Sequence, residues 1–173
     1  MRFAAFVLLF SSTASLVAQT PAAKPEDVGS LDAIVHAVYE VISGPAGKAR
    51  DWDRMRSLFY PGARLIPSRP NSEGGATARM LTVDDYVRMS GPNLEKSGFY
   101  ESEIWRKTET FGNIAHVFSA YESRRAPGEK PFARGINSMQ FMKDGNRWWV
   151  ITIFWDSERP GNPLPASATT TDK

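Results

Sequence analysis

The chain has 173 residues, with 21 Lys and Arg against 19 Asp and Glu, and it contains no basic run. This near balance of charge gives no indication of a nucleic-acid partner or of an anionic membrane surface. The absence of cysteine excludes disulfides, thiol catalysis and thiolate metal sites. Because 42% of the residues are apolar, we expect one domain of ordinary size that is stabilised by a packed core.

The N-terminal residues have the pattern of a secretory signal peptide. Arg2 gives a positive start, residues 3–10 are a short apolar run, and small residues lead to Val17 and Ala18. The run is too short to predict a membrane span, so we expect residues 1–18 to be removed and no membrane partner afterwards. Export without cysteine is typical of a bacterial protein, either periplasmic or secreted.

Two segments have compositions typical of disorder. Residues 19–29 are rich in Pro and Ala and predict a flexible linker, and residues 159–173 predict a disordered tail of Pro, Ala, Thr and Ser. The folded domain is therefore predicted to span residues 30–158.

Three helices are predicted in the first part of this domain. Ser30 can cap the first, over residues 31–42, because apolar residues recur there with helical spacing. The second spans about residues 51–60, and the third follows Thr82 until Gly91-Pro92 breaks or bends it. Between the last two helices, short strands are predicted over residues 63–68 and 77–81.

Four long strands with tight turns between them follow the helices. They are predicted over residues 98–111, 114–125, 130–143 and 147–156, and short Gly-containing turns separate them, as in antiparallel hairpins. The order of elements predicts an α+β fold in which three N-terminal helices pack on a strongly curved, mainly antiparallel sheet.

This order resembles the nuclear transport factor 2-like superfamily, to which the SnoaL-like proteins belong. Residues 51–65 (DWDRMRSLFYPGARL) are similar to that family's second helix and first strand, and residues 144–155 (DGNRWWVITIFW) are similar to its closing strand. The resemblance covers residues 30–158 and implies a cone-shaped fold with an internal cavity. It does not imply one activity, because cyclases, isomerases, dehydratases, hydrolases and proteins without a known role share the fold.

The ketosteroid isomerases of that superfamily offer a specific comparison. Their general base is an Asp on the first strand, and the matching residues 63–68 contain no carboxylate, so this route of proton abstraction lacks its base. Tyr39 lies near the position of their first-helix Tyr, which hydrogen-bonds the substrate oxygen.

Three side chains are candidates for acid–base catalysis. His116 and Glu122 share one phase of their strand, and Asp156 lies on an otherwise apolar phase of the last strand, where burial raises a carboxyl pKa. The alternative is a hydrogen-bonded sheet histidine and two carboxylates at strand ends.

Three further carboxylates lie on one predicted strand. Glu101, Glu103 and Glu109 share one phase of their strand, which we interpret as a solvated face. The two histidines make no metal motif, and no phosphate loop, nucleophile elbow or dinucleotide fingerprint is present, so no metal and no cofactor is expected.

The ligand-binding candidates are aromatic or polar residues expected around the cavity: Tyr39, Tyr121, Asn137 and Trp155. Tyr121 and Glu122 are neighbours on one strand and point to opposite faces, so both cannot contact one cavity unless a bulge intervenes.

The sequence therefore predicts an exported protein that binds a small apolar molecule in a cavity. One alternative is a cofactor-free cyclase, dehydratase or hydrolase-type enzyme that uses a pocket carboxylate with His or Tyr. The other is a non-catalytic dimerisation or interaction module. Both phases of residues 114–125 are apolar, which favours a homodimer formed through the sheet.

Overall fold

The computed structural model describes residues 21–169. The predicted signal peptide, residues 1–18, lies outside the described residues, as do residues 170–173 of the predicted tail. Within the described part, none of the helices combines the length and the apolar character needed to cross a membrane.

Helices occupy the first half of the fold, and four long strands complete the second half. The elements in chain order are α1 (Pro25–Val28), α2 (Leu31–Ile42), α3 (Trp52–Leu58), β1 (Phe59–Pro70), β2 (Ala76–Ala78), α4 (Val83–Ser97), β3 (Tyr100–Phe111), β4 (Ile114–Arg124), β5 (Ala133–Asp144), β6 (Arg147–Ser157) and the short 3-10 helix η1 (Ala166–Ala168). This order confirms the predicted α+β class.

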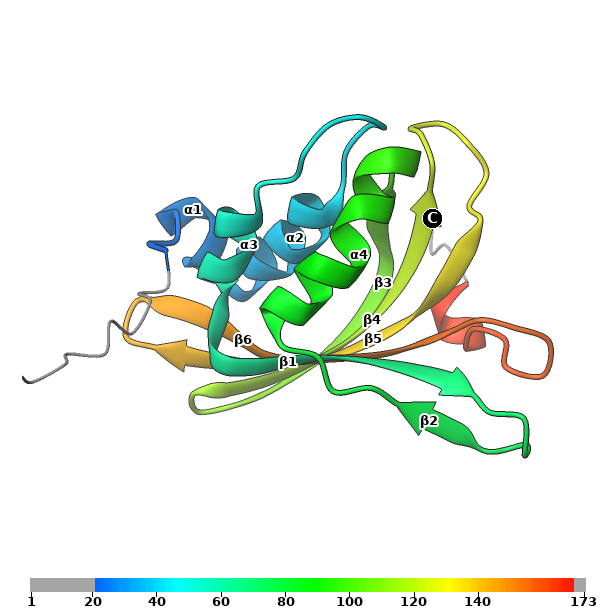
Figure 1. The fold of residues 1–173 in the computed structure, drawn as a ribbon. Coiled ribbons are helices and arrows are strands. Elements are labelled where there is room, and N and C mark those ends of the chain that lie inside the picture. Colours follow the sequence, from blue (N-terminus) through cyan, green and yellow to red (C-terminus); the bar gives the residue numbers. More distant parts are fainter. Residues whose placement is uncertain (1–20, 170–173) are drawn as a thin grey trace, which may run out of the picture.

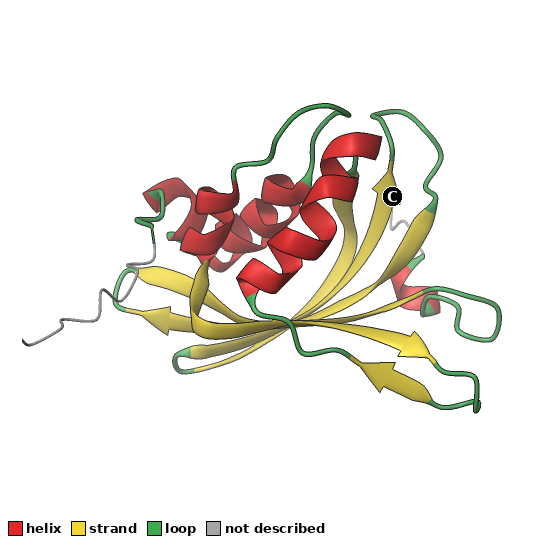
Figure 2. Cartoon of the chain, viewed as in Figure 1, coloured by secondary structure: helices red, strands yellow, loops and turns green. Residues whose placement is uncertain are grey.

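One curved sheet of six strands carries the fold, in the order β2-β1-β6-β5-β4-β3. All neighbouring pairs are antiparallel except β1 and β6, which run parallel. Figures 1 and 2 show α2, α3 and α4 gathered on the inner, concave side of the sheet. The core lies between these two layers.

The helix termini follow from local capping chemistry. The Ser30 hydroxyl accepts a hydrogen bond from the Ala33 amide at 3.1 Å, and Thr82 and Asp85 form a complete capping box at the start of α4. Of the two outcomes predicted at Gly91-Pro92, a break or a bend, the break is wrong, because α4 continues to Ser97. Leu94, beyond the proline, is buried in the core and holds the last turns of the helix in place.

A bulge in β3 changes which side chains face the helices. The register of β3 against β4 shifts between Glu103 and Trp105, so Ile104 is an extra residue. An extra residue reverses the alternation of faces along a strand. Glu101 and Glu103 therefore point inward before the bulge, whereas Glu109 lies on the exposed outer phase after it.

A second irregularity acts in the same way on β6. In the register against β5, Gln140 pairs with Thr152 and Phe141 with Val150, so Ile151 of β6 is an extra residue. Val150 and Ile153 are therefore both buried on the inner face. Trp155 is thereby carried to the inner face, and Phe154 to the outer one, where it is 45% exposed.

Both ends of the described chain are more ordered than expected. The segment predicted as a linker contains α1, with Val28 buried and Asp27 held by two hydrogen bonds of 2.8 Å from Arg54. These bonds from the guanidinium lower the pKa of Asp27. In the segment predicted as a tail, Leu164 and Ala168 are buried. Packing of these few apolar side chains outweighs the disorder-promoting composition around them.

Candidate functional site

A cavity of about 260 Å³ lies between the helices and the concave face of the sheet. Ligand pockets usually measure about 300–1,000 Å³, so this cavity suits a small molecule. Its lining is mostly aliphatic and aromatic and comes from α2, α3, α4 and five of the strands. The lining residues are Val38, Ile42, Met55, Phe59, Leu65, Tyr86, Ser90, Leu94, Phe99, Glu101, Tyr121, Ser123, Phe132, Ala133, Asn137, Ile153 and Trp155.

One carboxyl group, that of Glu101, stands in this apolar lining. β3 and β4 pair Glu101 with Ser123, whose hydroxyl donates a hydrogen bond to Glu101 Oε2 at 2.9 Å. Burial raises the pKa of Glu101 to about 7, although hydrogen bonds from Ser123 and Asn137 favour the charged form. No basic side chain among residues 21–169 forms an ion pair with it, so desolvation dominates.

Two tyrosines of the cavity supply hydroxyl groups. Burial raises the pKa of Tyr86, and the nearby Glu101 carboxylate raises it further. Burial also raises the pKa of Tyr121 to about 12, while its bond with the Ser157 hydroxyl, at 3.3 Å, acts in the opposite direction. Both phenols are therefore neutral hydrogen-bond donors at neutral pH.

Tyr121 fits into the sheet because the residue opposite it has no side chain. Gly135 of β5 pairs with Tyr121 across the ladder. A Cβ atom on Gly135 would lie 2.5 Å from the Tyr121 hydroxyl oxygen and 2.4 Å from the carbonyl oxygen of Asp156. The glycine is thus required by a close approach and fixes where the phenol lies.

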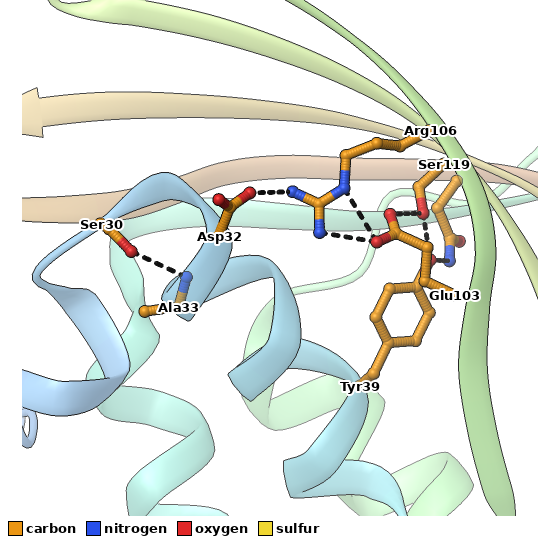
Figure 3. Close-up of polar contacts among 8 residues, drawn as sticks. Ser30, Asp32, Ala33, Tyr39, Glu103, Arg106 and Ser119 are labelled. Carbon is orange, nitrogen blue, oxygen red and sulfur yellow. Dashed lines mark hydrogen bonds and ion pairs between the residues drawn. The ribbon is translucent and has the colours of Figure 1, made fainter.

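A chain of hydrogen bonds runs behind the cavity (Figure 3). Asn137 donates from Nδ2 to the Tyr39 hydroxyl at 3.1 Å, and the Tyr39 and Ser119 hydroxyls lie 2.7 Å apart. Ser119 donates its own proton to Glu103 Oε1 at 2.5 Å, so Tyr39 must donate to Ser119. Each polar group in this buried chain is satisfied, and the amide of Asn137 is held in one orientation at the cavity wall.

The chain ends in a set of ion pairs at the surface. Arg106 donates to Glu103 Oε2 from Nε at 2.8 Å and from Nη2 at 2.6 Å, and it reaches Asp32 of α2 at 2.6 Å. Glu103 thus has the cationic partner that Glu101 lacks. These residues border a second cleft of about 860 Å³ between α2 and β3, which is lined by more charged side chains than the cavity and which Glu101 also borders.

The predicted ligand-binding residues do not all lie in the cavity. Tyr121, Asn137 and Trp155 line it together. Tyr39 lies one hydrogen bond behind Asn137, and both of its hydrogen bonds are to buried protein groups. It acts on the cavity only by orienting Asn137.

The predicted catalytic candidates lie elsewhere. His116 and Glu122 face outward from β4, where His116 shares a 3.0 Å hydrogen bond with Ser138 and Glu122 pairs with Arg124. Asp156 lies near the end of β6 and pairs with Arg159 at 2.7 Å. None of the three lines the cavity, because the strand phase turns their side chains away from it. Within residues 21–169, no three His, Asp or Glu side chains cluster as metal ligands would.

The cavity carboxyl itself was not among the predicted site residues. The expectation that Glu101, Glu103 and Glu109 share one solvated face is wrong for the first two, because the bulge at Ile104 separates them from Glu109. Glu101 faces the same side as Tyr121 and Ser123, on the inward phase of β4, only because of this bulge, so the sequence offered no direct signal for it.

Comparison with known proteins supports the fold and leaves the activity open. No family model and no curated protein sequence matches the chain. Among solved structures, it is similar to an uncharacterised protein with a cystatin-like fold from Caulobacter vibrioides, at 13% identity and a TM-score of 0.55, over 76% of this chain and 89% of that one.

Two further solved structures with a similar fold are described as nuclear transport factor 2-like proteins. A nuclear transport factor 2-like superfamily protein from Salmonella enterica serovar Typhimurium is 16% identical, with a TM-score of 0.51, over 79% of this chain and 91% of that one. An NTF-2-like protein of unknown function from Silicibacter pomeroyi is 14% identical, with a TM-score of 0.51, over 74% and 92%.

Proposed function

Taking the nuclear transport factor 2-like fold as the premise, we propose that the protein binds a small, largely apolar molecule in the cavity around Glu101. One observation carries the proposal: an apolar cavity of about 260 Å³ contains a carboxyl group that has no cationic partner in the part of the chain that the structure describes. Leaving such a group unpaired costs stability, so it is more readily explained by contact with a ligand than by packing.

A second candidate function is proton transfer to or from the bound molecule. A general acid or base works best when its pKa lies near the working pH, and burial brings the pKa of Glu101 to about 7. The Tyr86 and Tyr121 hydroxyls lie in the same cavity and can donate hydrogen bonds to a developing negative charge. This would be the cofactor-free enzyme predicted from the sequence, with Glu101 as its carboxylate.

A thermal-shift screen of small apolar and aromatic compounds tests the binding proposal. A compound at a hundred times its Kd stabilises the fold by about 2.7 kcal/mol, a rise of a few degrees in Tm. Ser90→Leu places a larger side chain at the cavity wall and should abolish the shift. Met89→Leu, on the neighbouring half-exposed position of α4, is the matched control and should keep it.

Failure of every compound to raise the Tm would instead favour the non-catalytic interaction module. The outer face of the sheet supports a role in association in either case. Phe118 and Phe154 are 37% and 45% exposed and each is paired across the ladder with Ser138. We propose a homodimer through this face, since a two-fold contact would cover both rings at once.

Export to the periplasm or the medium also stays a proposal. It rests on the Arg2, apolar run and Val17-Ala18 pattern of the first residues. Intact-mass measurement of exported protein should show the loss of about 18 residues, and retention of Met1 in that material would contradict it.

A further inference from the structure

The charged side chains of the cavity lining determine which ligands it can accept. Of its seventeen residues, Glu101 is the only one with a charged side chain, and the lining includes no Lys, Arg or His. A ligand with a carboxylate or phosphate group would therefore meet a like charge with no basic residue to offset it. The lining admits neutral and cationic ligands and disfavours anionic ones.

Aromatic rings make up much of the remaining wall. Six of the seventeen lining residues are aromatic: Phe59, Tyr86, Phe99, Tyr121, Phe132 and Trp155. The face of such a ring is electron-rich and attracts a cation, most strongly where water is excluded. Tyr86 and Trp155 meet edge to face, with ring centroids 6.5 Å apart, so the two rings present differently directed surfaces.

We propose that the ligand is an apolar amine, bound as its ammonium ion between the Glu101 carboxylate and the aromatic wall. The proposal rests on the proposed binding function and names its ligand class. The ammonium group would donate a charge-assisted hydrogen bond to the carboxylate. The apolar part would fill the space lined by residues such as Val38, Leu65 and Ile153.

The tyrosines around Glu101 leave its negative charge to be neutralised by a ligand. Tyr39 from α2, Tyr86 from α4 and Tyr121 from β4 all interact with its charge, and burial raises the pKa of each. All three are therefore neutral at pH 7. Tyr86 and Tyr121 line the cavity and can orient a ligand, but none of the three can neutralise the carboxylate.

Two basic residues beside the cavity have partners other than Glu101. Arg125 lies at the rim, 4.1 Å over the Phe132 ring, and reaches the Gly98 carbonyl. Arg50 donates to backbone carbonyls, including those of Ile42 and Leu94 beside the cavity.

The second cleft, which Glu101 also borders, contains further basic residues. Arg106 there pairs with Glu103 and Asp32, and Arg124 pairs with Glu122. His36 also borders that cleft. Because no basic side chain within residues 21–169 forms an ion pair with Glu101, a ligand ammonium would supply its cationic partner.

Three probes with one skeleton test the proposal: indan-2-amine, indan-2-ol and indane-2-carboxylic acid, each titrated into the full chain by calorimetry at pH 8. The amine should bind about tenfold more tightly than the alcohol, the usual effect of a hydrogen bond between charged groups. The carboxylic acid should bind at least tenfold more weakly than the alcohol.

The variant Glu101→Gln and a titration at lower pH test whether the Glu101 carboxylate causes the preference for the amine. In Glu101→Gln the preference for the amine over the alcohol should disappear while the alcohol still binds. In the wild type the preference should fall at pH 5.5, because the carboxyl is then protonated while the amine, like a lysine side chain, keeps its proton. Glu109→Gln, an exposed position on the same strand, should change neither affinity.

The outcomes separate the inference from the function on which it rests. If the alcohol binds as tightly as the amine and Glu101→Gln changes neither, the amine inference is overturned and the binding function stands. If the amine preference persists in Glu101→Gln, the ammonium binds elsewhere and the inference is overturned. If none of the three probes binds, the inference and the proposed function both fail for ligands of this size.

Discussion

Glu101 and Glu103 lie two residues apart on the same face of β3, yet only one of them has a cationic partner. Glu103 is held by Arg106 and by the Ser119 hydroxyl, whereas Glu101 accepts a hydrogen bond from Ser123 and lines the apolar cavity. The bulge at Ile104 comes directly after Glu103 and reverses which face of the sheet the following side chains of β3 point to. The paired glutamate anchors the polar chain behind the cavity, and the unpaired one is available to a ligand.

The stability of the fold should depend on pH through Glu101. Because folding raises the pKa of this carboxyl from 4.5 to about 7, its stabilising contribution is complete below pH 4.5 and is lost as the pH rises through 7. Relative to the wild type, Glu101→Gln should gain about 2–3 kcal/mol in free energy of unfolding between pH 4.5 and pH 8. Urea denaturation at the two pH values measures this.

The control for this experiment is Glu109→Gln, since Glu109 is exposed and lies on the opposite phase of the same strand. It should show no comparable gain. A difference between wild type and Glu101→Gln that stays constant from pH 4.5 to pH 8 would mean that the carboxyl titrates normally.

The hydroxyl of Tyr39 should stabilise the domain without contacting the ligand. Tyr39→Phe leaves Ser119 without its donor and Asn137 without its acceptor, both in buried positions. We expect a loss of about 1–3 kcal/mol in denaturant unfolding. Tyr60→Phe is the control, because Tyr60 is 42% exposed. Equal effects of the two substitutions would argue against the hydrogen-bond chain.

Gly135→Ala should displace Tyr121. The added methyl group would overlap the Tyr121 hydroxyl and the Asp156 carbonyl, and relief of this overlap costs about 2 kcal/mol. The near-ultraviolet circular dichroism of the tyrosines should change with the stability. Gly75→Ala is the control, because a Cβ there meets only the flexible Asn71 side chain. An unchanged Gly135→Ala protein would show that Tyr121 does not pack as described.

The proposed dimer depends on the exposed rings of the outer face. Light scattering of the wild type should give twice the monomer mass at micromolar concentration, and Phe118→Asp should give the monomer mass because it buries a charge in the contact. Met80→Asp, on an exposed residue next to β2, should leave the mass unchanged. A wild type that remains monomeric at high concentration would exclude this association.

The sequence predicted the elements well and the inward residues of two strands poorly. Alternation along β4 predicts that Tyr121 and Glu122 point to opposite faces, and of the two only Tyr121 lines the cavity. Alternation fails at Ile104 and Ile151, where one extra residue reverses it, and neither isoleucine carries a local signal for a bulge. Glu101 was therefore misplaced, since the face of a strand segment is decided by its partner across the ladder.

The order of the chain ends was missed for a related reason. Composition describes the average solvation of a segment, whereas α1 is held by one buried side chain, Val28, and by one ion pair, between Asp27 and Arg54. The partner of Asp27 is 27 residues away in the sequence. Contacts of this kind depend on tertiary placement and not on local pattern.

The most direct test of the central claim is a titration of the Glu101 carboxyl by carbon-13 NMR, with Glu101→Gln used to assign its resonance. In the free protein the midpoint should lie near pH 7. Saturation with indan-2-amine should lower it, because an ammonium group beside the carboxylate favours the charged form. A midpoint near the ordinary value of 4.5 that no probe moves would contradict the claim that Glu101 is an unpaired carboxyl in a ligand-binding cavity.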